Sequence, residues 1–108
     1  MKALPISIRK NGYNYTQINR GSKALIYRQE ISSKASYYEV FLLRTSRERR
    51  IKDVLLPAKE IFPSNEAFGE WAWTFRDYKS AEWRFNELEK GLTHFEFTYP
   101  NSTRKKYS

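Results

Sequence analysis

Basic side chains gather in one short stretch of this sequence, and they are suited to holding an anion. They are Arg44, Arg47, Arg49, Arg50 and Lys52. A guanidinium forks two hydrogen bonds to one phosphate or carboxylate, and a turn carries it to anions that a flat sheet face does not reach. The alternative is a solvated turn, in which Glu48 and Asp53 neutralise part of the charge. The cations of an expected hairpin extend the candidate patch, namely Arg20, Lys23 and Arg28.

Aromatic residues make up 17% of the chain, so rings are available both for a core and for contacts at the surface. Sheets that bind single-stranded nucleic acid present rings for base stacking, flanked by Lys and Arg for the phosphates. Tyr13 and Tyr15 lie in a candidate strand, and we expect them in that role. The alternative is core packing, which we favour for a second set, Trp71, Trp73 and Phe75.

Trp83 lies off the apolar stripe of a candidate helix. An exposed Trp on a helix is a candidate contact for a partner molecule. The alternative is that Trp83 packs beneath the connecting segment of residues 54–69.

Catalytic chemistry has few candidate residues in this chain. It contains one His and no Cys, and it lacks the phosphate-binding and nucleophile motifs of the common enzyme classes. His94 shares a candidate strand face with Glu96, a pairing that can transfer protons. A solvated strand face is the simpler interpretation, and no ligand spacing supports a metal site. We therefore expect a protein that is not an enzyme, with no cofactor and no metal.

Charge is distributed unevenly along the chain, whose formal net charge is +8. Residues 1–56 hold twelve basic and four acidic side chains, whereas residues 57–100 hold five and eight. Such asymmetry favours a polyanionic partner, although charge also serves solubility alone. No window is long and apolar enough for a membrane span, and no leader or Cys pattern points to secretion, so we expect a cytoplasmic protein.

The cations and rings need a scaffold, and β-strands dominate the first half of the expected one. Residues 4–9 alternate as a short edge strand does, and residues 13–20 and 23–31 form the clearest hairpin. Residues 37–45 are apolar on both faces, which is typical of a central strand covered on both sides. Residues 46–53 read as a charged turn, and residues 54–69 as an extended loop with one helical turn.

The remaining elements are a strand, a helix and a possible last strand. Residues 70–76 form the strand, with the two tryptophans and Phe75 on one face. A helix follows Asp77 as N-cap, carries Tyr78, Ala81, Phe85 and Leu88 on one stripe, and ends at Gly91. Residues 95–99 alternate as a half-buried strand, and residues 101–108 form a disordered basic tail. The chain is therefore expected to be one α+β domain over residues 1–100, an antiparallel sheet of four to five strands with the helix on one face.

Three stretches carry a family resemblance: RKNGYNYT at residues 9–16, YEVF at residues 38–41 and FPSNEAFGEWAW at residues 62–73. They resemble small, uncharacterised basic proteins of gut Bacteroidetes and their crAss-like phages, over most of residues 5–90. The resemblance implies no activity, because none is established for that group, but it implies a phage or mobile-element gene and hence a bacterial host cytoplasm. The strand order is also loosely similar to single-strand-binding PC4-type and WGR-type domains, in fold alone and without the Trp-Gly-Arg signature.

These observations predict a non-enzymatic protein that binds nucleic acid, either single-stranded DNA or RNA, and prefers single strands to duplex. The alternative is a protein–protein module, such as a phage accessory factor, an inhibitor of a host protein or a minor assembly component. It would use Trp83 and the uncovered sheet face, and its charge would steer it to an acidic partner. That uncovered face is also where a second copy would form a homodimer.

Overall fold

Turn residues divide most of the chain into short strands, and a helix follows the last of them. The computed structural model describes residues 2–91. Its strands are β1 (Ser7–Lys10), β2 (Tyr13–Arg20), β3 (Ala24–Ser32), β4 (Ala35–Leu42), β5 (Thr45–Ser46), β6 (Arg49–Ile51), β7 (Val54–Leu56), β8 (Lys59–Glu60) and β9 (Ala72–Phe75). A short 3-10 turn, η1 (Asn65–Ala67), precedes β9, and the helix α1 (Tyr78–Glu89) follows it.

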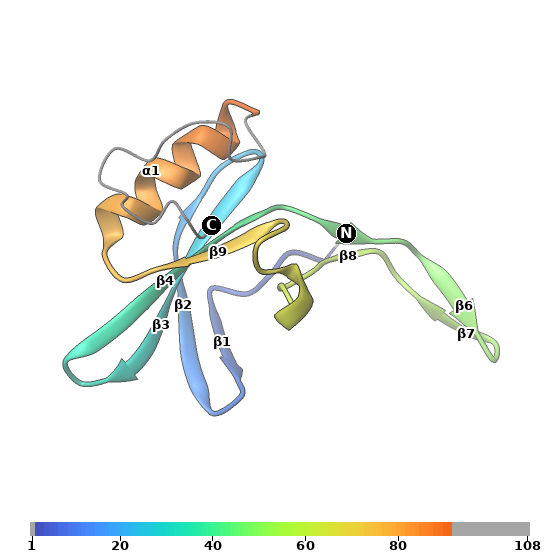
Figure 1. The fold of residues 1–108 in the computed structure, drawn as a ribbon. Helices are drawn as coiled ribbons and strands as arrows, with labels where there is room; N and C mark the ends of the chain where they lie inside the picture. Colours follow the sequence, from blue (N-terminus) through green and yellow to red (C-terminus); the bar gives the residue numbers. More distant parts are fainter. Residues whose placement is uncertain (1, 92–108) are drawn as a thin grey trace.

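The main sheet consists of β1, β2, β3, β4 and β9 in that order, with every neighbouring pair antiparallel (Figure 1). The first four strands are successive hairpins, and β9 returns from far along the chain to pair with β4. Asn11 and Gly12 join β1 to β2 with φ values of 54° and 84°, as tight hairpin turns require. The predicted fold, an antiparallel sheet of four to five strands with one helix in the C-terminal half, is confirmed.

Helix α1 covers one face of the sheet and buries its apolar stripe there. Asp77 caps the helix as the sequence predicts, because its carboxylate accepts a hydrogen bond of 2.9 Å from the backbone N–H of Ser80. Ala81, Phe85 and Leu88 face the sheet, where they join a buried cluster with Ala24, Ile26, Val40 and Trp73.

The opposite face of the sheet is covered by the chain that runs from β8 to β9. Phe62 lies at its centre and meets Tyr15, Tyr27 and Phe41 edge-on, with ring centroids 5.2, 5.3 and 5.3 Å away. Further apolar residues pack around these rings, namely Leu4, Ile8, Leu43, Phe68 and Trp71. The sequence left this face open to solvent, to the connecting segment of residues 54–69, to a C-terminal strand or to a partner. The structure shows that the connecting segment covers its apolar part.

Trp71 and Trp73 lie on different faces of the sheet, so their predicted common face is wrong. β9 begins only at Ala72, because the chain before it turns through Gly69, whose φ is 91°. Trp73 therefore packs beneath the helix. Trp71 instead contacts Phe41 on the other face, with ring centroids 6.3 Å apart.

Residues 45–60, which we call the arm, form strands where the sequence predicts a turn and an extended loop. β5 pairs with β8 at the root of the arm, and β6 pairs with β7 at its tip. The tip comprises residues 49–56. Lys52 and Asp53, with φ values of 48° and 66°, form the two-residue turn between β6 and β7. Figure 1 shows the arm projecting away from the main sheet and the helix.

Some expectations concern residues outside the described part of the chain. They are the last strand at residues 95–99, the pairing of His94 with Glu96, and the basic tail at residues 101–108. Within residues 2–91, no helix has the length and apolar character needed to cross a membrane.

Candidate nucleic-acid interface

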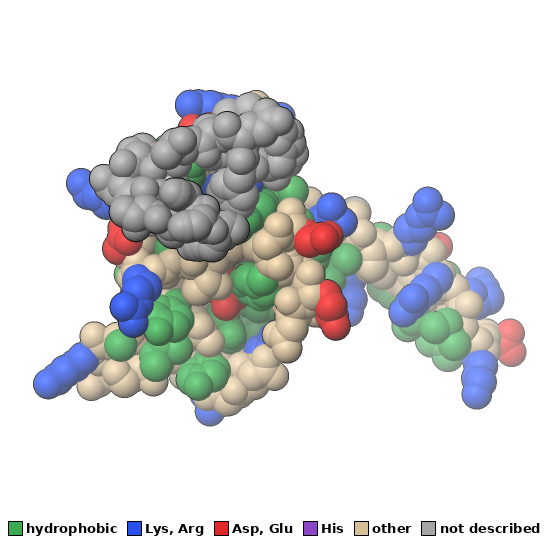
Figure 2. Space-filling view, viewed as in Figure 1, with side chains coloured by type: hydrophobic (Ala, Val, Ile, Leu, Met, Phe, Trp, Pro, Cys, Tyr) green, Lys and Arg blue, Asp and Glu red, His purple; other side chains and the backbone are tan. Residues whose placement is uncertain are grey.

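The arm carries four of the eight basic residues that the sequence singled out. Arg47, Arg49, Arg50 and Lys52 lie in a run, residues 47–55, in which every residue is exposed. Lys and Arg side chains extend from the arm around a group of hydrophobic ones (Figure 2). Arg49 is opposite Leu56 in the ladder and Arg50 is opposite Leu55. Because neighbouring residues of a strand point to opposite faces, the two arginines place charge on both faces of the tip.

These four cations are available to a ligand. Among residues 2–91, none of them forms an ion pair or a side-chain hydrogen bond, and the acidic residues between them, Glu48 and Asp53, form none either. The charged groups of the arm are therefore solvated by water and not neutralised by other side chains of the described protein. Phosphate oxygens would meet guanidinium groups that need not break an existing bond.

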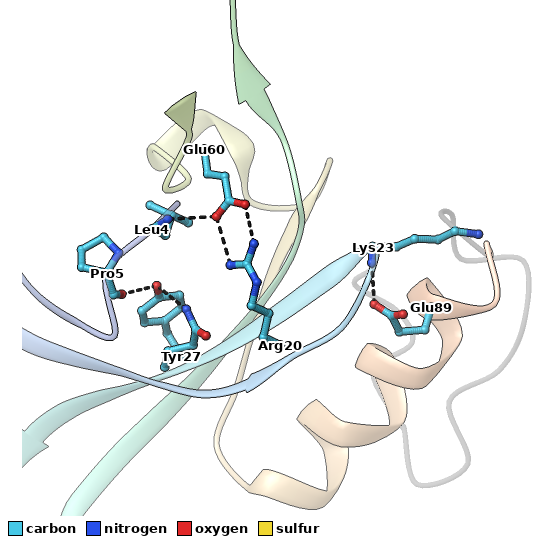
Figure 3. Close-up of polar contacts among 8 residues, drawn as sticks. Leu4, Pro5, Arg20, Lys23, Tyr27, Glu60 and Glu89 are labelled. Atoms are coloured by element: carbon cyan, nitrogen blue, oxygen red, sulfur yellow. Dashed lines mark hydrogen bonds and ion pairs between the residues drawn. The ribbon is translucent and has the colours of Figure 1, made fainter. Parts of the chain in front are cut away.

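The root of the arm is fixed to the main sheet by a carboxylate, as Figure 3 shows. Glu60 in β8 accepts hydrogen bonds from the two terminal guanidinium nitrogens of Arg20 in β2, and one of 2.9 Å from the backbone N–H of Leu4. The bond from Arg20 lowers the pKa of Glu60, although the burial of the carboxylate acts in the opposite direction. Lys2 adds backbone bonds to Ala58 and Glu60, at 3.3 and 2.8 Å. The arm is thus held firmly at one end only.

The other predicted cations lie on the main sheet or at its junction with the arm. Arg20 is committed to Glu60, and Nη2 of Arg28 lies 3.5 Å from the carboxylate of Glu30. Arg44 precedes the arm and places its guanidinium 5.1 Å from the ring centroid of Trp71. The structure therefore unites four of the predicted basic residues on the arm and separates them from the cations of β2 and β3.

Lys23 is exposed in the turn between β2 and β3, which the end of the helix holds in place. Glu89 accepts the backbone N–H groups of Ser22, Lys23 and Ala24, at 3.1, 2.8 and 2.7 Å. Burial raises the pKa of Glu89, but these bonds and one from the Ser22 hydroxyl outweigh it and lower the pKa. The side chain of Lys23 extends away from Glu89 in Figure 3.

The aromatic candidates differ in their access to solvent. Tyr13 is 40% exposed, whereas Tyr15 is 5% exposed and packs against Phe62. The Tyr15 hydroxyl accepts a bond of 2.9 Å from Gln29, and burial raises its pKa to about 12. Tyr15 is therefore a core ring in the described structure and has no open face for a base. Trp83 is half-buried on α1.

Sequence reasoning missed the apolar residues at the tip of the arm. Ile51, Val54 and Leu55 are 46%, 57% and 50% exposed, beside the cations. Apolar residues are expected inside a protein by default, so the pattern of residues 54–56 predicts a loop over the core. The signal that could have found these exposed residues is their position directly after the charged turn, which keeps them beside its cations.

No metal site is indicated in the described residues. Across residues 2–91, no group of three or more His, Cys, Asp or Glu side chains is arranged to hold a metal ion.

The arrangement of the arm suits binding to an extended anion, through contacts that several phosphates can share. No family model matches the chain, and neither a curated protein nor a solved structure matches it.

Proposed function

We propose that this chain binds nucleic acid and that the arm supplies its phosphate contacts. The observation that carries the proposal is the set of exposed, unpaired cations on a ribbon that projects from the main sheet. Cations that are scattered over a surface serve solubility equally well. A projecting ribbon with charge on both faces instead fits between the phosphate rows of a nucleic acid, which lie on both sides of a groove.

The binding energy in this proposal comes mainly from counterion release. Each phosphate that a cation neutralises frees condensed ions, so affinity falls as salt rises. The tip and its flanks, residues 47–58, hold four basic and two acidic side chains, a local excess that suits such contacts. Phosphates carry no base information, so we propose binding without sequence specificity at these residues. We propose no catalytic step.

Stacking on the main sheet contributes less than the sequence suggested. The preference for single strands rested on Tyr13 and Tyr15, and only Tyr13 offers an exposed ring. Lys10 is the direct ladder partner of Tyr13, so one base could stack there beside a cation. We therefore place the main contact on the arm, which meets phosphates of single strands and duplexes alike.

The test is a binding titration of the full chain against single-stranded DNA, duplex DNA and RNA at several salt concentrations. The triple change Arg47→Ala, Arg49→Ala and Arg50→Ala should flatten the log–log salt dependence by about two units on a single strand and about 2.7 on a duplex. Affinity should fall alike for all base sequences. Absence of binding by the unmodified chain at low salt would end the proposal.

A matched control separates the arm from net charge. Lys23, Lys34 and Lys79 are exposed cations of the sheet turns and the helix, and changing all three to Ala removes the same charge as the arm triple. We expect the control to lower affinity much less than the arm triple does. Equal losses would mean that overall charge, and not the arm, provides binding.

An acidic protein is the second candidate partner, because three exposed aliphatic side chains accompany the cations of the arm. Interfaces between proteins bury such mixtures of apolar and cationic side chains. In that case oligonucleotides would bind weakly from the outset, and the arm triple would slow association with the acidic partner.

A further inference from the structure

The two faces of the tip differ in composition. Cross-strand partners lie on the same face of an antiparallel ribbon, so the paired Ile51 and Val54 share a face with the paired Arg49 and Leu56. The paired Arg50 and Leu55 occupy the other. Lys52 and Asp53 occupy the turn between them. One face of the tip therefore ends in an aliphatic pair, which we call the wedge (Ile51 and Val54).

The wedge has no packing partner in the described protein. Within residues 2–91, neither core cluster contains a residue of the arm, and the wedge residues are 46% and 57% exposed. Aliphatic side chains in water are unfavourable, and an exposed apolar ribbon is also a site of unwanted strand pairing. Ile51 and Val54 are the last ladder pair before the turn of the projecting ribbon, so they lie where a partner meets the arm early (Figure 1).

We propose that the wedge inserts between base pairs of duplex DNA and kinks the duplex. This inference rests on the proposed function, since the cations of the arm must first bring it to the phosphates. Apolar side chains that enter a groove unstack one base step and bend the helix axis, and the bend brings more phosphates to the protein. Base faces are the apolar surface that a nucleic acid offers, and in a duplex they become accessible only through such unstacking.

The distribution of charge around the wedge favours a duplex over an acidic protein surface. Arg49 lies on the wedge face, Arg50 on the opposite face and Lys52 at the turn. A duplex groove has a row of phosphates along each side, with stacked bases between the rows. An apolar tip flanked by cations on both faces matches that order, whereas the patch of an acidic protein lies on one side of a ribbon only.

The test measures the end-to-end distance of a duplex of about 30 base pairs by energy transfer between dyes on its two ends, at saturating protein. The unmodified chain should shorten that distance. The double change Ile51→Thr and Val54→Thr keeps β-branched residues and the strand but removes the apolar contact, so the bend should be lost while the salt dependence of binding stays the same. Ile51→Phe, which enlarges the wedge, should retain the bend.

Leu55→Thr is the matched control, since Leu55 is 50% exposed, between the values of the two wedge residues, but lies on the opposite face of the ribbon. It should bend the duplex as the unmodified chain does. Binding without a change in the end-to-end distance would overturn the wedge, and so would a double Thr variant that still bends DNA or a control that loses the bend equally. A chain that binds no oligonucleotide fails the titration, which rejects the proposed function before bending is measured.

Discussion

The arm and the main sheet both contain a hairpin with a two-residue turn, but only the hairpin of the main sheet is packed against a core. Asn11–Gly12 joins β1 to β2 and Lys52–Asp53 joins β6 to β7, each through two residues with positive φ. β2 then pairs with β3 in the main sheet, where its Tyr15 and Ile18 join the core clusters on the two faces. The β6–β7 ribbon has no third strand and no covering layer in the described chain.

This difference shows that the turn selects a hairpin and burial determines its stability. A two-stranded ribbon alone is only marginally stable in water, whereas three or more strands with a covered face are stable. The arm should therefore open locally at low cost, while the sheet and helix unfold together. Four substitutions test that contrast, in descending order of expected effect on the free energy of unfolding.

Phe85→Ala should have the largest effect. Phe85 lies on the side of α1 that faces the sheet, where it is 7% exposed and belongs to one cluster with Trp73 and Leu88. Its loss leaves a cavity, so the free energy of unfolding should fall by roughly 3–5 kcal/mol, measured by urea denaturation. The matched change on the arm, Leu55→Ala, should cost within about 0.5 kcal/mol. A native-like Phe85→Ala variant would show that the helix does not bury this stripe.

Glu39 should make the stability of the sheet depend on pH. Burial raises its pKa from 4.5 to about 7, and the nearby Lys10 offsets part of that rise. Tyr15 and Tyr27 belong to the same face, and burial raises the pKa of each above its usual value of 10, so neither ionises in this range. A pKa raised by folding means that the folded state resists ionisation of the Glu39 carboxyl. The contribution of Glu39 to the free energy of unfolding is therefore fully present below pH 4.5 and is lost as pH rises through about 7.

Glu39→Gln isolates that effect. The pKa difference corresponds to at most about 3 kcal/mol, since one unit is about 1.4 kcal/mol. The variant should match the unmodified chain near pH 4.5 and exceed its free energy of unfolding near pH 8, in paired denaturation curves. Glu39 belongs to β4 of the main sheet and not to the arm, so the opening of the arm should not follow this pH dependence. A flat difference between the two curves would contradict the raised pKa.

Gly21→Ala tests how the helix end holds the turn between β2 and β3. A Cβ at Gly21 would lie 2.2 Å from Oε2 of Glu89, which must then release backbone N–H groups that include those of Lys23 and Ala24. The N–H of Lys23 is exposed and can bond to water, whereas that of Ala24 is part-buried. A buried donor without a partner costs about 1–3 kcal/mol, so we expect a loss toward the lower end of that range. In the Glu89→Ala background the same change should cost much less, and equal costs in a double-mutant cycle would refute the contact.

The sequence predicts the helix and the covered strand, because both depend on the spacing of residues that are neighbours in the chain. The 3.6-residue stripe, Asp77 and Gly91 predicted the helix, and Gly91 has the positive φ of 93° expected after a helix end. The apolar residues on both faces of residues 37–45 predicted a strand that is covered on both sides, and it corresponds to β4. These signals involve neighbours in the chain, so one sequence suffices to read them.

The arm and its surroundings depended on partners that spacing does not reveal. The turn at Lys52–Asp53 contains no glycine, and an arginine-rich strand looks like a solvated turn until its partner is known. Arg20 could be identified as a cation, but its bond to Glu60 joins residues 40 positions apart. Composition therefore located the candidate cations, and only the structure separated the four on the arm from Arg20 and Arg28, which form ion pairs.

Asp53→Gly should have the smallest effect on global stability, and it brings the arm turn close to the Asn11–Gly12 turn. Asp tolerates a φ of 66° better than most residues, but Gly removes the remaining strain while its greater freedom in the unfolded chain offsets part of the gain. We expect the ribbon to gain a few tenths of a kcal/mol, so that amide hydrogen exchange across residues 49–56 slows about twofold. The urea midpoint should stay unchanged, because opening of the arm exposes no core residue. In the reciprocal change Gly12→Asp, nothing lies within 4 Å of the added Cβ, but the φ of 84° strains the backbone of a residue with a side chain. It should lower the midpoint because β1 belongs to the cooperative sheet. If Asp53→Gly moved the midpoint and Gly12→Asp did not, the arm would belong to the cooperative unit and the contrast between the two regions would fail.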